Sequence, residues 1–158
     1  MTVDISLRFD IADLHAAYAA CLDSGDFDQW PLLFTEDCRY RVVARENFDR
    51  DLPLSIMDLQ SRGALMDRVY GISSTLFHAP YYQRHIIGPA TVAADGSGAW
   101  TAQSNYLVIR TKRDMPSEVF NAGRYIDRIE STPDGLRFAA RTCVFDSELI
   151  PNSIIYPI

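Results

Sequence analysis

The sequence has 158 residues, of which 47% are hydrophobic and 23% are charged, with a net charge of −6. This length and balance are typical of one globular domain that buries its own core, and we assign residues 1–158 to a single domain. The negative charge, without a cluster of Lys or Arg, excludes nucleic acid as an expected partner.

The first residues lack the basic-then-apolar order of a signal peptide, and no apolar run reaches the ~20 residues that a membrane span needs. Cysteines occur at three widely separated positions, Cys21, Cys38 and Cys143. An odd number of distant cysteines predicts free thiols in a reducing compartment. We therefore expect a cytoplasmic protein with no membrane contact.

The first predicted element is a helix over residues 10–22, capped by Asp10. Its apolar residues recur three or four positions apart and form one stripe, made of Ile11, Leu14, Tyr18, Cys21 and Leu22. A short helix is expected over 28–34, where Pro31 is tolerable only in a first turn. The alternation within 38–44 predicts a strand with one buried face.

A third helix is expected over residues 55–70, with Gly71 ending it. Its predicted stripe is Ile56, Leu59, Gly63, Met66 and Tyr70. From there to the end the pattern is strand-like, over 84–93, 100–111, 118–130 and 136–147, with a turn at 132–135. Helices followed by long strands predict an α+β fold, a long curved antiparallel sheet covered on one face by the N-terminal helices.

The last ten residues, 149–158, carry no charged side chain. Chain ends are usually polar and frayed, so an apolar end must pack along its own domain or against another chain. The sequence leaves both possibilities open.

Residue types that perform chemistry are sparse. His15, His78 and His85 do not stand with the cysteines at the spacings of zinc or iron–sulfur ligands. There is no glycine-rich phosphate loop and no Gly-x-Ser-x-Gly elbow. We predict no catalytic, cofactor-binding or metal-binding residue on this chain, and we interpret His15 as a partly buried, hydrogen-bonded histidine.

Residues 75–85 concentrate histidine, tyrosine and arginine beside the start of the sheet. Because Tyr, Phe and Arg are favoured in interface cores, docking on a neighbouring surface is the first interpretation, with ordinary packing second. The third is catalysis, in which His85 forms an acid–base pair with Tyr40 or Asp67 in a cavity.

Polar residues also interrupt the apolar stretch 119–129, at Asn121, Arg124 and Asp127. A buried charge requires a partner, and Arg141 lies roughly opposite Asp127 across the turn, so these two are predicted to pair on one face. Whether such residues line a cavity or rim an interface stays open.

Several short segments, in order and spacing, resemble the small (β) subunits of Rieske-type aromatic-ring hydroxylating oxygenases. They are Trp30-Pro31-x-x-Phe34, Asp37-Cys38-x-Tyr40-Arg41-Val42, Arg45-Glu46-Asn47-Phe48, Asp67-Arg68-x-Tyr70, Tyr82-Gln83-Arg84-His85-Ile86-Ile87-Gly88, Ser104-Asn105-Tyr106, Glu118-Val119-Phe120 and Val144-x-Asp146-Ser147. The resemblance runs from about residue 8 onward. It is strongest to subunits of oxygenases acting on aromatic carboxylic acids, salicylate 5-hydroxylase first, then anthranilate and terephthalate dioxygenases.

The resemblance implies an NTF2-like cone and an α3β3 assembly in which the small subunits also contact one another as a trimer. The large subunit would carry the Rieske [2Fe–2S] cluster, the mononuclear iron and the substrate pocket, with electrons arriving through a ferredoxin and a reductase. It implies no catalytic residue here, and it leaves open the exact substrate and whether one or two oxygen atoms are inserted.

Three functions are therefore weighed. The first is a non-catalytic structural subunit of such an oxygenase. The alternative is a stand-alone, cofactor-free dehydratase or isomerase on the same cone fold, using His85, Tyr40 and Asp67. A small-ligand binding module is the third.

Overall fold

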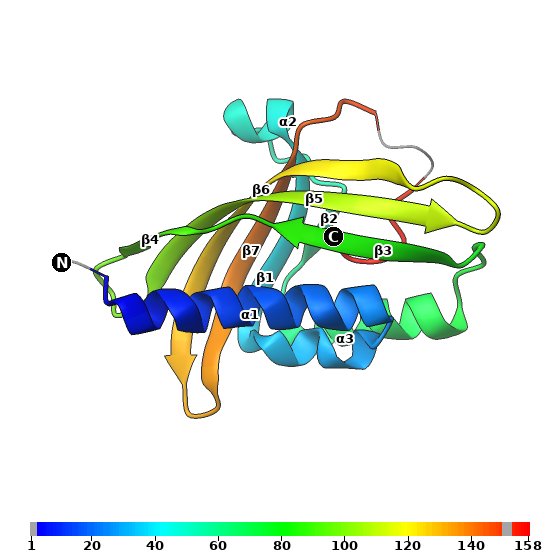
Figure 1. Cartoon of the computed structure of the whole chain (residues 1–158). Coiled ribbons are helices and arrows are strands. Elements are labelled where there is room, and N and C mark those ends of the chain that lie inside the picture. Colours follow the sequence, from blue (N-terminus) through cyan, green and yellow to red (C-terminus); the bar gives the residue numbers. More distant parts are fainter. Residues whose placement is uncertain (1–2, 150–152) are drawn as a thin grey trace.

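The computed structural model describes residues 3–149 and 153–158. Helices and a long curled sheet form the predicted α+β cone (Figure 1). The elements are α1 (Ile5–Ser24), the 3₁₀ helices η1 (Phe27–Gln29) and η2 (Pro31–Leu33), β1 (Phe34–Ala44), α2 (Arg45–Asp49), β2 (Met57–Leu59), α3 (Arg62–Ser74), β3 (Tyr81–Ile87), β4 (Thr91–Ala94), β5 (Trp100–Lys112), β6 (Glu118–Thr132) and β7 (Gly135–Phe145).

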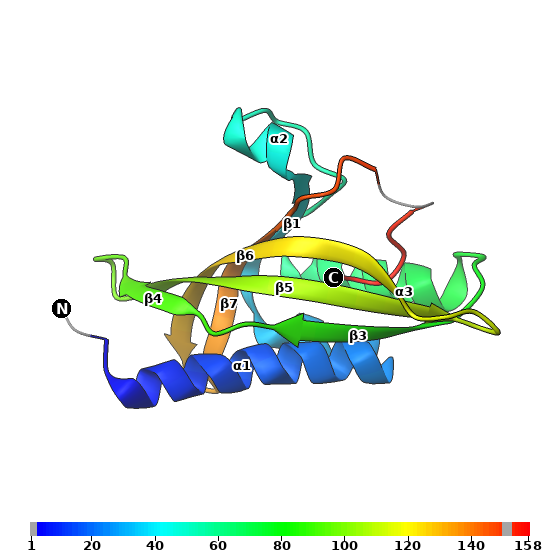
Figure 2. The ribbon, with the colours of Figure 1, turned by 45° about the horizontal axis from the view of Figure 1, so that its top comes forward.

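The sheet of the described residues has seven strands in the order β2-β1-β7-β6-β5-β3, with β4 also paired to β5. Figure 2 shows its strong curl, with α1 and α3 lying on the same side. The prediction of an antiparallel sheet is wrong at one place, because β1 runs parallel to β7. A parallel neighbour from the other end of the chain leaves no local signal, since its pairing depends on no adjacent turn.

Helix α1 confirms the predicted stripe, whose five members are all buried. It begins five residues earlier than expected, after Asp4, so the prediction that Asp10 caps it is wrong. The preceding turn contains no helix breaker, and Leu7 within it packs against the core. The helix ends at Ser24 and is followed by Gly25, whose φ of 77° is left-handed, a conformation that suits glycine.

Two further helix predictions need correction. The short helix expected over 28–34 is divided into two 3₁₀ helices, η1 and η2, with Pro31 in the first turn of η2 as predicted, and Phe34 already belongs to β1. The helix predicted over 55–70 is instead the strand β2 followed by α3, and Gly71 lies inside α3. Ser61 caps α3 by accepting a hydrogen bond from the Ala64 N–H at 3.1 Å, so the chain cannot continue a helix through it. The predicted stripe is also wrong, since the face turned to the core carries Leu65, Val69 and Ile72.

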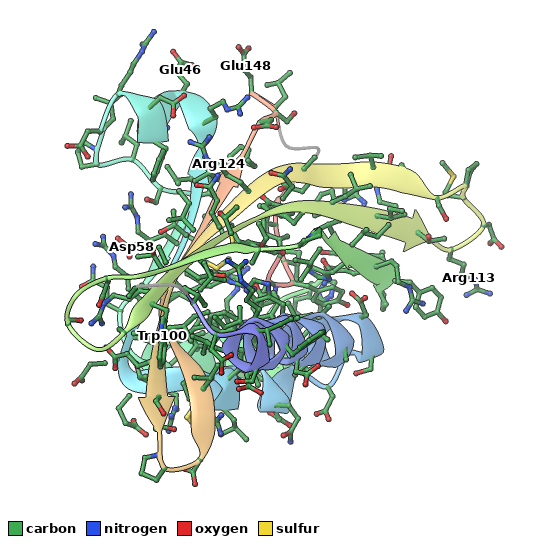
Figure 3. The ribbon with its side chains drawn as sticks, turned by 60° about the vertical axis from the view of Figure 1, so that its left-hand side comes forward. Glu46, Asp58, Trp100, Arg113, Arg124 and Glu148 are labelled. Atoms are coloured by element: carbon green, nitrogen blue, oxygen red, sulfur yellow. The ribbon has the colours of Figure 1, made fainter. Side chains whose placement is uncertain are left out.

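The strands follow the prediction closely, with two differences. The first is that β1 begins at Phe34, four residues before the predicted start at Cys38. The second is that residues 84–93 are divided into β3 and β4, and the interruption includes Pro89, which has no N–H for a ladder. The turn at 132–135 joins β6 to β7 as predicted, with Gly135 at a φ of 100°. Charged side chains project outward around the sheet and its loops, among them those of Glu46, Arg113 and Glu148 (Figure 3).

The end of the chain packs along its own domain. Ile154, Tyr156 and Ile158 are buried, and Ile158 has no exposed surface. Self-packing of the apolar tail is thus confirmed for these residues, whereas 150–152 lie outside the described part. Contact of the tail with another chain stays a prediction.

Candidate functional site

Asp127 on β6 is a buried carboxylate that accepts three hydrogen bonds. Its carboxylate accepts two hydrogen bonds from Arg141 on β7, from Nε at 2.8 Å and from Nη2 at 2.7 Å. It accepts a third from His15 Nε2 on α1, at 3.0 Å. All three side chains are buried, so the predicted pairing of Asp127 with Arg141 is confirmed, and His15 is hydrogen-bonded as interpreted.

Burial and charge oppose each other in this network. Burial alone would raise the pKa of Asp127, but the charge and hydrogen bonds of Arg141, with the bond from His15, hold that pKa below its usual value. Burial lowers the pKa of His15, and the bond to Asp127 only partly offsets this. At neutral pH the network therefore consists of a carboxylate, a guanidinium and a neutral imidazole, which is one negative charge against one positive.

Aromatic rings enclose the guanidinium of Arg141. Its central carbon lies 4.1 Å from the ring centroids of Tyr18, Tyr125 and Phe138. Such contacts stabilise a cation that has lost its water. The cluster joins α1, β6 and β7 and pairs its two charges, as a structural anchor does, while Arg141 Nη1 and the Tyr125 hydroxyl have no hydrogen-bond partner among the described residues.

A second histidine joins α1 to β3. His85 Nδ1 lies 2.6 Å from Asp23 Oδ1, and the His85 backbone N–H donates to the same carboxylate. Because a carboxylate accepts, Nδ1 carries a proton. Nε2 is buried and has no hydrogen-bond partner among the described residues.

The side chain of Tyr40 is hydrogen-bonded to the last residue of the chain. Its hydroxyl accepts a hydrogen bond from the Ile158 N–H at 3.0 Å and donates to the Ile158 main-chain oxygen at 2.9 Å. The Tyr18 hydroxyl donates to that same oxygen. Burial raises the pKa of Tyr40 well above its usual value, so its proton is not available near neutral pH.

The acid–base pair considered for catalysis is therefore not formed. His85 is bonded to Asp23, Tyr40 to Ile158, and Asp67 is exposed on α3. Sequence reasoning missed the partners of His15 and His85, which lie 112 and 62 residues away in the chain. The position of His15 beside a buried stripe was the only available signal.

The aromatic segment 75–85 divides into two parts. His78 Nε2 lies 2.9 Å from the Tyr156 hydroxyl, and the rings of Tyr81 and Tyr156 are 4.5 Å apart. Phe77 and Tyr82 are instead exposed, with Phe77 entirely so. Part of the segment thus holds the tail, and the rest presents aromatic surface.

Potential metal donors do not gather in the described ranges 3–149 and 153–158. No group of three or more His, Cys, Asp or Glu side chains there could hold a metal ion. The cysteines are free and buried, as predicted, and burial raises the pKa of Cys21 to about 12, of Cys38 to about 11 and of Cys143 to about 12. This donor set does not fit a Rieske cluster, which takes two thiolates and two imidazoles. No helix in these ranges is long and apolar enough to cross a membrane.

Comparison with known proteins identifies the family to which this fold belongs. The SnoaL-like domain model matches residues 3–142. The chain is 33% identical to the anthranilate 1,2-dioxygenase small subunit of Burkholderia cepacia, over 100% of this chain and 98% of that one. It is 30% identical to subunit beta 2 of the terephthalate 1,2-dioxygenase terminal oxygenase component of Comamonas sp, over 96% and 98%.

A solved structure supports the same family. A β subunit described as part of an aromatic-ring-hydroxylating dioxygenase from Novosphingobium aromaticivorans superposes with a TM-score of 0.87, at 36% identity and 97% coverage of both chains. The fold is thus that of a SnoaL-like, NTF2-like domain. Within it, the chain belongs to the family of small (β) subunits of aromatic-ring-hydroxylating dioxygenases.

Proposed function

We propose that this chain is the non-catalytic small subunit of a terminal oxygenase component that hydroxylates an aromatic carboxylate, with salicylate as the first substrate to test. It would assemble with a large subunit as α3β3. The large subunit would carry the Rieske cluster, the mononuclear iron and the substrate pocket, and a ferredoxin and reductase would supply the electrons. This chain would bury surface against the large subunits and hold them in fixed positions relative to one another.

The relatives support the substrate class, because anthranilate and terephthalate in their printed names are both aromatic carboxylates. The interior supports a structural role. Tyr40, Asp127 and Arg141 are hydrogen-bonded within the chain and buried, so none of them presents a surface to a substrate.

The observation that carries the proposal is the apolar surface that the fold leaves uncovered. Phe77 is 105% exposed, Tyr82 79% and Val119 64%. Neighbouring apolar side chains on a surface mark places where another chain binds, and Tyr82 and Val119 lie on β3 and β6, the two strands that flank β5. Phe77 and Tyr82 also belong to the segment 75–85 that the sequence predicts as an interface.

The test is co-expression with a candidate large subunit, sought first in the neighbouring open reading frame. We expect one stable hetero-oligomer by light scattering, with the iron bound entirely to the large subunit. Phe77→Ser should reduce the recovered large subunit several-fold, whereas Leu32→Ser, at another exposed apolar residue (47%), should not. A chain that stays monomeric beside the large subunit would contradict the proposal.

The alternative, a stand-alone dehydratase or isomerase, is tested with the small subunit purified alone. Such an enzyme would act without the large subunit, and His85→Ala would remove its turnover while the chain stayed folded. We expect no turnover from the isolated wild-type chain.

A further inference from the structure

The tail residues 153–158 lie in the mouth of the cone, between α3 and the curled sheet (Figure 2). They are not a strand of that sheet, because β7 has already ended at Phe145. The residues that follow β7, 146–149, are exposed, with Leu149 at 83%. The tail can therefore leave the mouth without breaking a ladder of the sheet.

Side chains of the folded domain hold the main-chain oxygens of the tail. Arg68 Nη2 on α3 donates to the oxygens of Ile154 and Ile155, at 2.8 Å each. From the sheet, Gln83 Nε2 donates to the oxygen of Pro157 at 3.4 Å. A segment held in this way needs no neighbouring strand, so a separate peptide of the same sequence can make the same hydrogen bonds.

The last residue of the tail covers a thiol. The hydroxyls of Tyr18 and Tyr40 both donate to the Ile158 main-chain oxygen, as described above. The Sγ atom of Cys143 lies 3.4 Å from the same oxygen. Cys143 has no exposed surface, so its thiol reports whether the tail is in place.

The side chains of the tail supply the apolar part of the contact. Ile154, Tyr156 and Ile158, at alternate positions, are all buried. The ring of Tyr156 lies 4.8 Å from that of Phe27 and 4.5 Å from that of Tyr81. Burial at alternate positions is the pattern of an extended peptide that turns one face to its receptor.

We propose that the mouth of the cone is a binding site for an extended apolar peptide, which the chain fills with its own residues 153–158. When its own tail has left, the site takes the same segment of a second copy. The sheet stays folded in this opened form, and Cys143 becomes accessible, since chain ends open more readily than the core. The site lies within one chain, so it does not depend on the proposed function.

The test is alkylation by iodoacetamide, read by mass spectrometry, because trypsin leaves Cys143 on a different peptide from Cys21 and Cys38. The full chain carrying Tyr156→Asp and Ile158→Asp cannot keep two carboxylates buried, so its tail should leave the site. We expect Cys143 to react about tenfold faster than in the wild type, or more, because local opening sets its rate. The rates at Cys21 and Cys38 should stay unchanged.

An acetylated peptide of residues 153–158 is then added to this aspartate variant. It should protect Cys143 saturably, whereas the same peptide carrying Tyr156→Ser should protect it far less. Adding Arg68→Met to the variant should weaken protection about tenfold, the usual effect of losing a hydrogen bond from a charged group.

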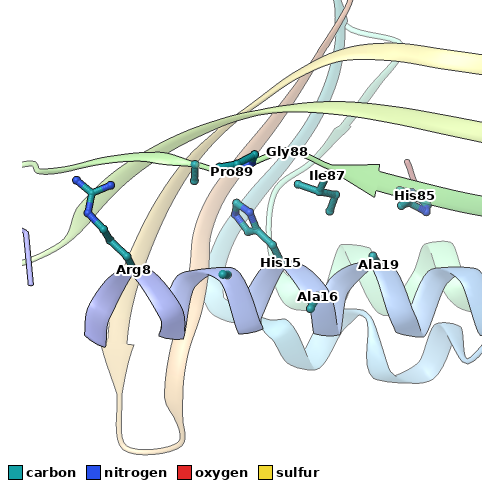
Figure 4. A pocket seen from close by; sticks show the side chains of 10 residues that line it. Arg8, His15, Ala16, Ala19, His85, Ile87, Gly88 and Pro89 are labelled. Atoms are coloured by element: carbon teal, nitrogen blue, oxygen red, sulfur yellow. The ribbon is translucent and has the colours of Figure 1, made fainter. Parts of the chain in front are cut away.

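The matched control on α1 is Ala16→Phe. It fills a pocket of about 470 Å³ between this helix and residues 87–90 (Figure 4). The residues that line this pocket form none of the hydrogen bonds to the tail described above. Protection by the peptide should therefore be the same with and without Ala16→Phe.

A second variant leaves the sequence of the tail intact. Arg68→Met alone should raise the rate at Cys143 about tenfold and leave Cys21 and Cys38 unchanged. Arg84→Met, at an exposed residue of β3, should change none of the three rates. Equal rises at all three thiols in Arg68→Met, or no saturable protection by the peptide, would overturn the proposal.

Discussion

Asp127 and Arg141 lie directly opposite each other on β6 and β7, and two hydrogen bonds at 2.8 and 2.7 Å join them in a region closed to solvent. A buried ion pair of this kind contributes little net stability compared with apolar side chains of the same shape. Losing one partner is a different matter, because the other is then left charged in the interior.

Asp127→Asn should therefore lower the free energy of unfolding by about 3–5 kcal/mol, since Arg141 stays charged without its counter-ion. The measurement is urea denaturation at pH 7. Asp58→Asn is the matched control, because Asp58 pairs with Arg39 at the surface, and its loss should be below ~1 kcal/mol. Equal losses in the two variants would show that burial is not what makes the pair at Asp127 sensitive.

His15 should make stability depend on pH below neutrality. Burial holds its pKa in the folded chain below the ordinary 6.5, so in that window the unfolded chain binds more protons. The contribution is complete above pH 6.5 and is lost as the pH falls below it, by up to ~1.4 kcal/mol per unit.

His15→Gln removes the titrating group and isolates this effect. The wild type should lose part of its stability advantage over the variant between pH 6.5 and 5, as measured by urea denaturation at each pH. Parallel curves for the two proteins would contradict the expectation.

Gly123 occupies a place in β6 where no side chain fits. A Cβ there would lie 1.9 Å from the Val144 main-chain oxygen and 2.9 Å from Phe145 Cα, both backbone atoms of β7. Gly123→Ala should thus destabilise the chain by roughly 3 kcal/mol or more, because the two strands must separate locally. Gly71→Ala, inside α3 with its nearest neighbour at 3.7 Å, should instead stabilise by about 0.5–1 kcal/mol. Thermal unfolding of both variants gives the comparison.

The parts of the fold that sequence predicts well are those with local causes. The stripe of α1 follows from its spacing, and the turn at 132–135 brings Asp127 opposite Arg141, so their pairing could be predicted. The error at 55–70 is also local. The apolar spacing from Ile56 to Tyr70 fits a helix by coincidence, while the capping residue Ser61 marks where α3 begins.

What could not be predicted depends on contacts between distant segments. The bond from His15 to Asp127 exists because α1 crosses the concave face over β6 and β7. The parallel pairing of β1 with β7 and the docking of Ile158 on Tyr40 arise in the same way, from the curl of the whole sheet.

The parallel pairing of β1 with β7 has a consequence for biosynthesis. Everything from Arg45 to Asp134 must be translated before the partner strand of β1 emerges from the ribosome. During this interval one edge of β1 carries unpaired backbone groups, and such edges attract foreign strands. Contacts between distant segments also form slowly, so the nascent chain stays open to aggregation until its last strand is inserted.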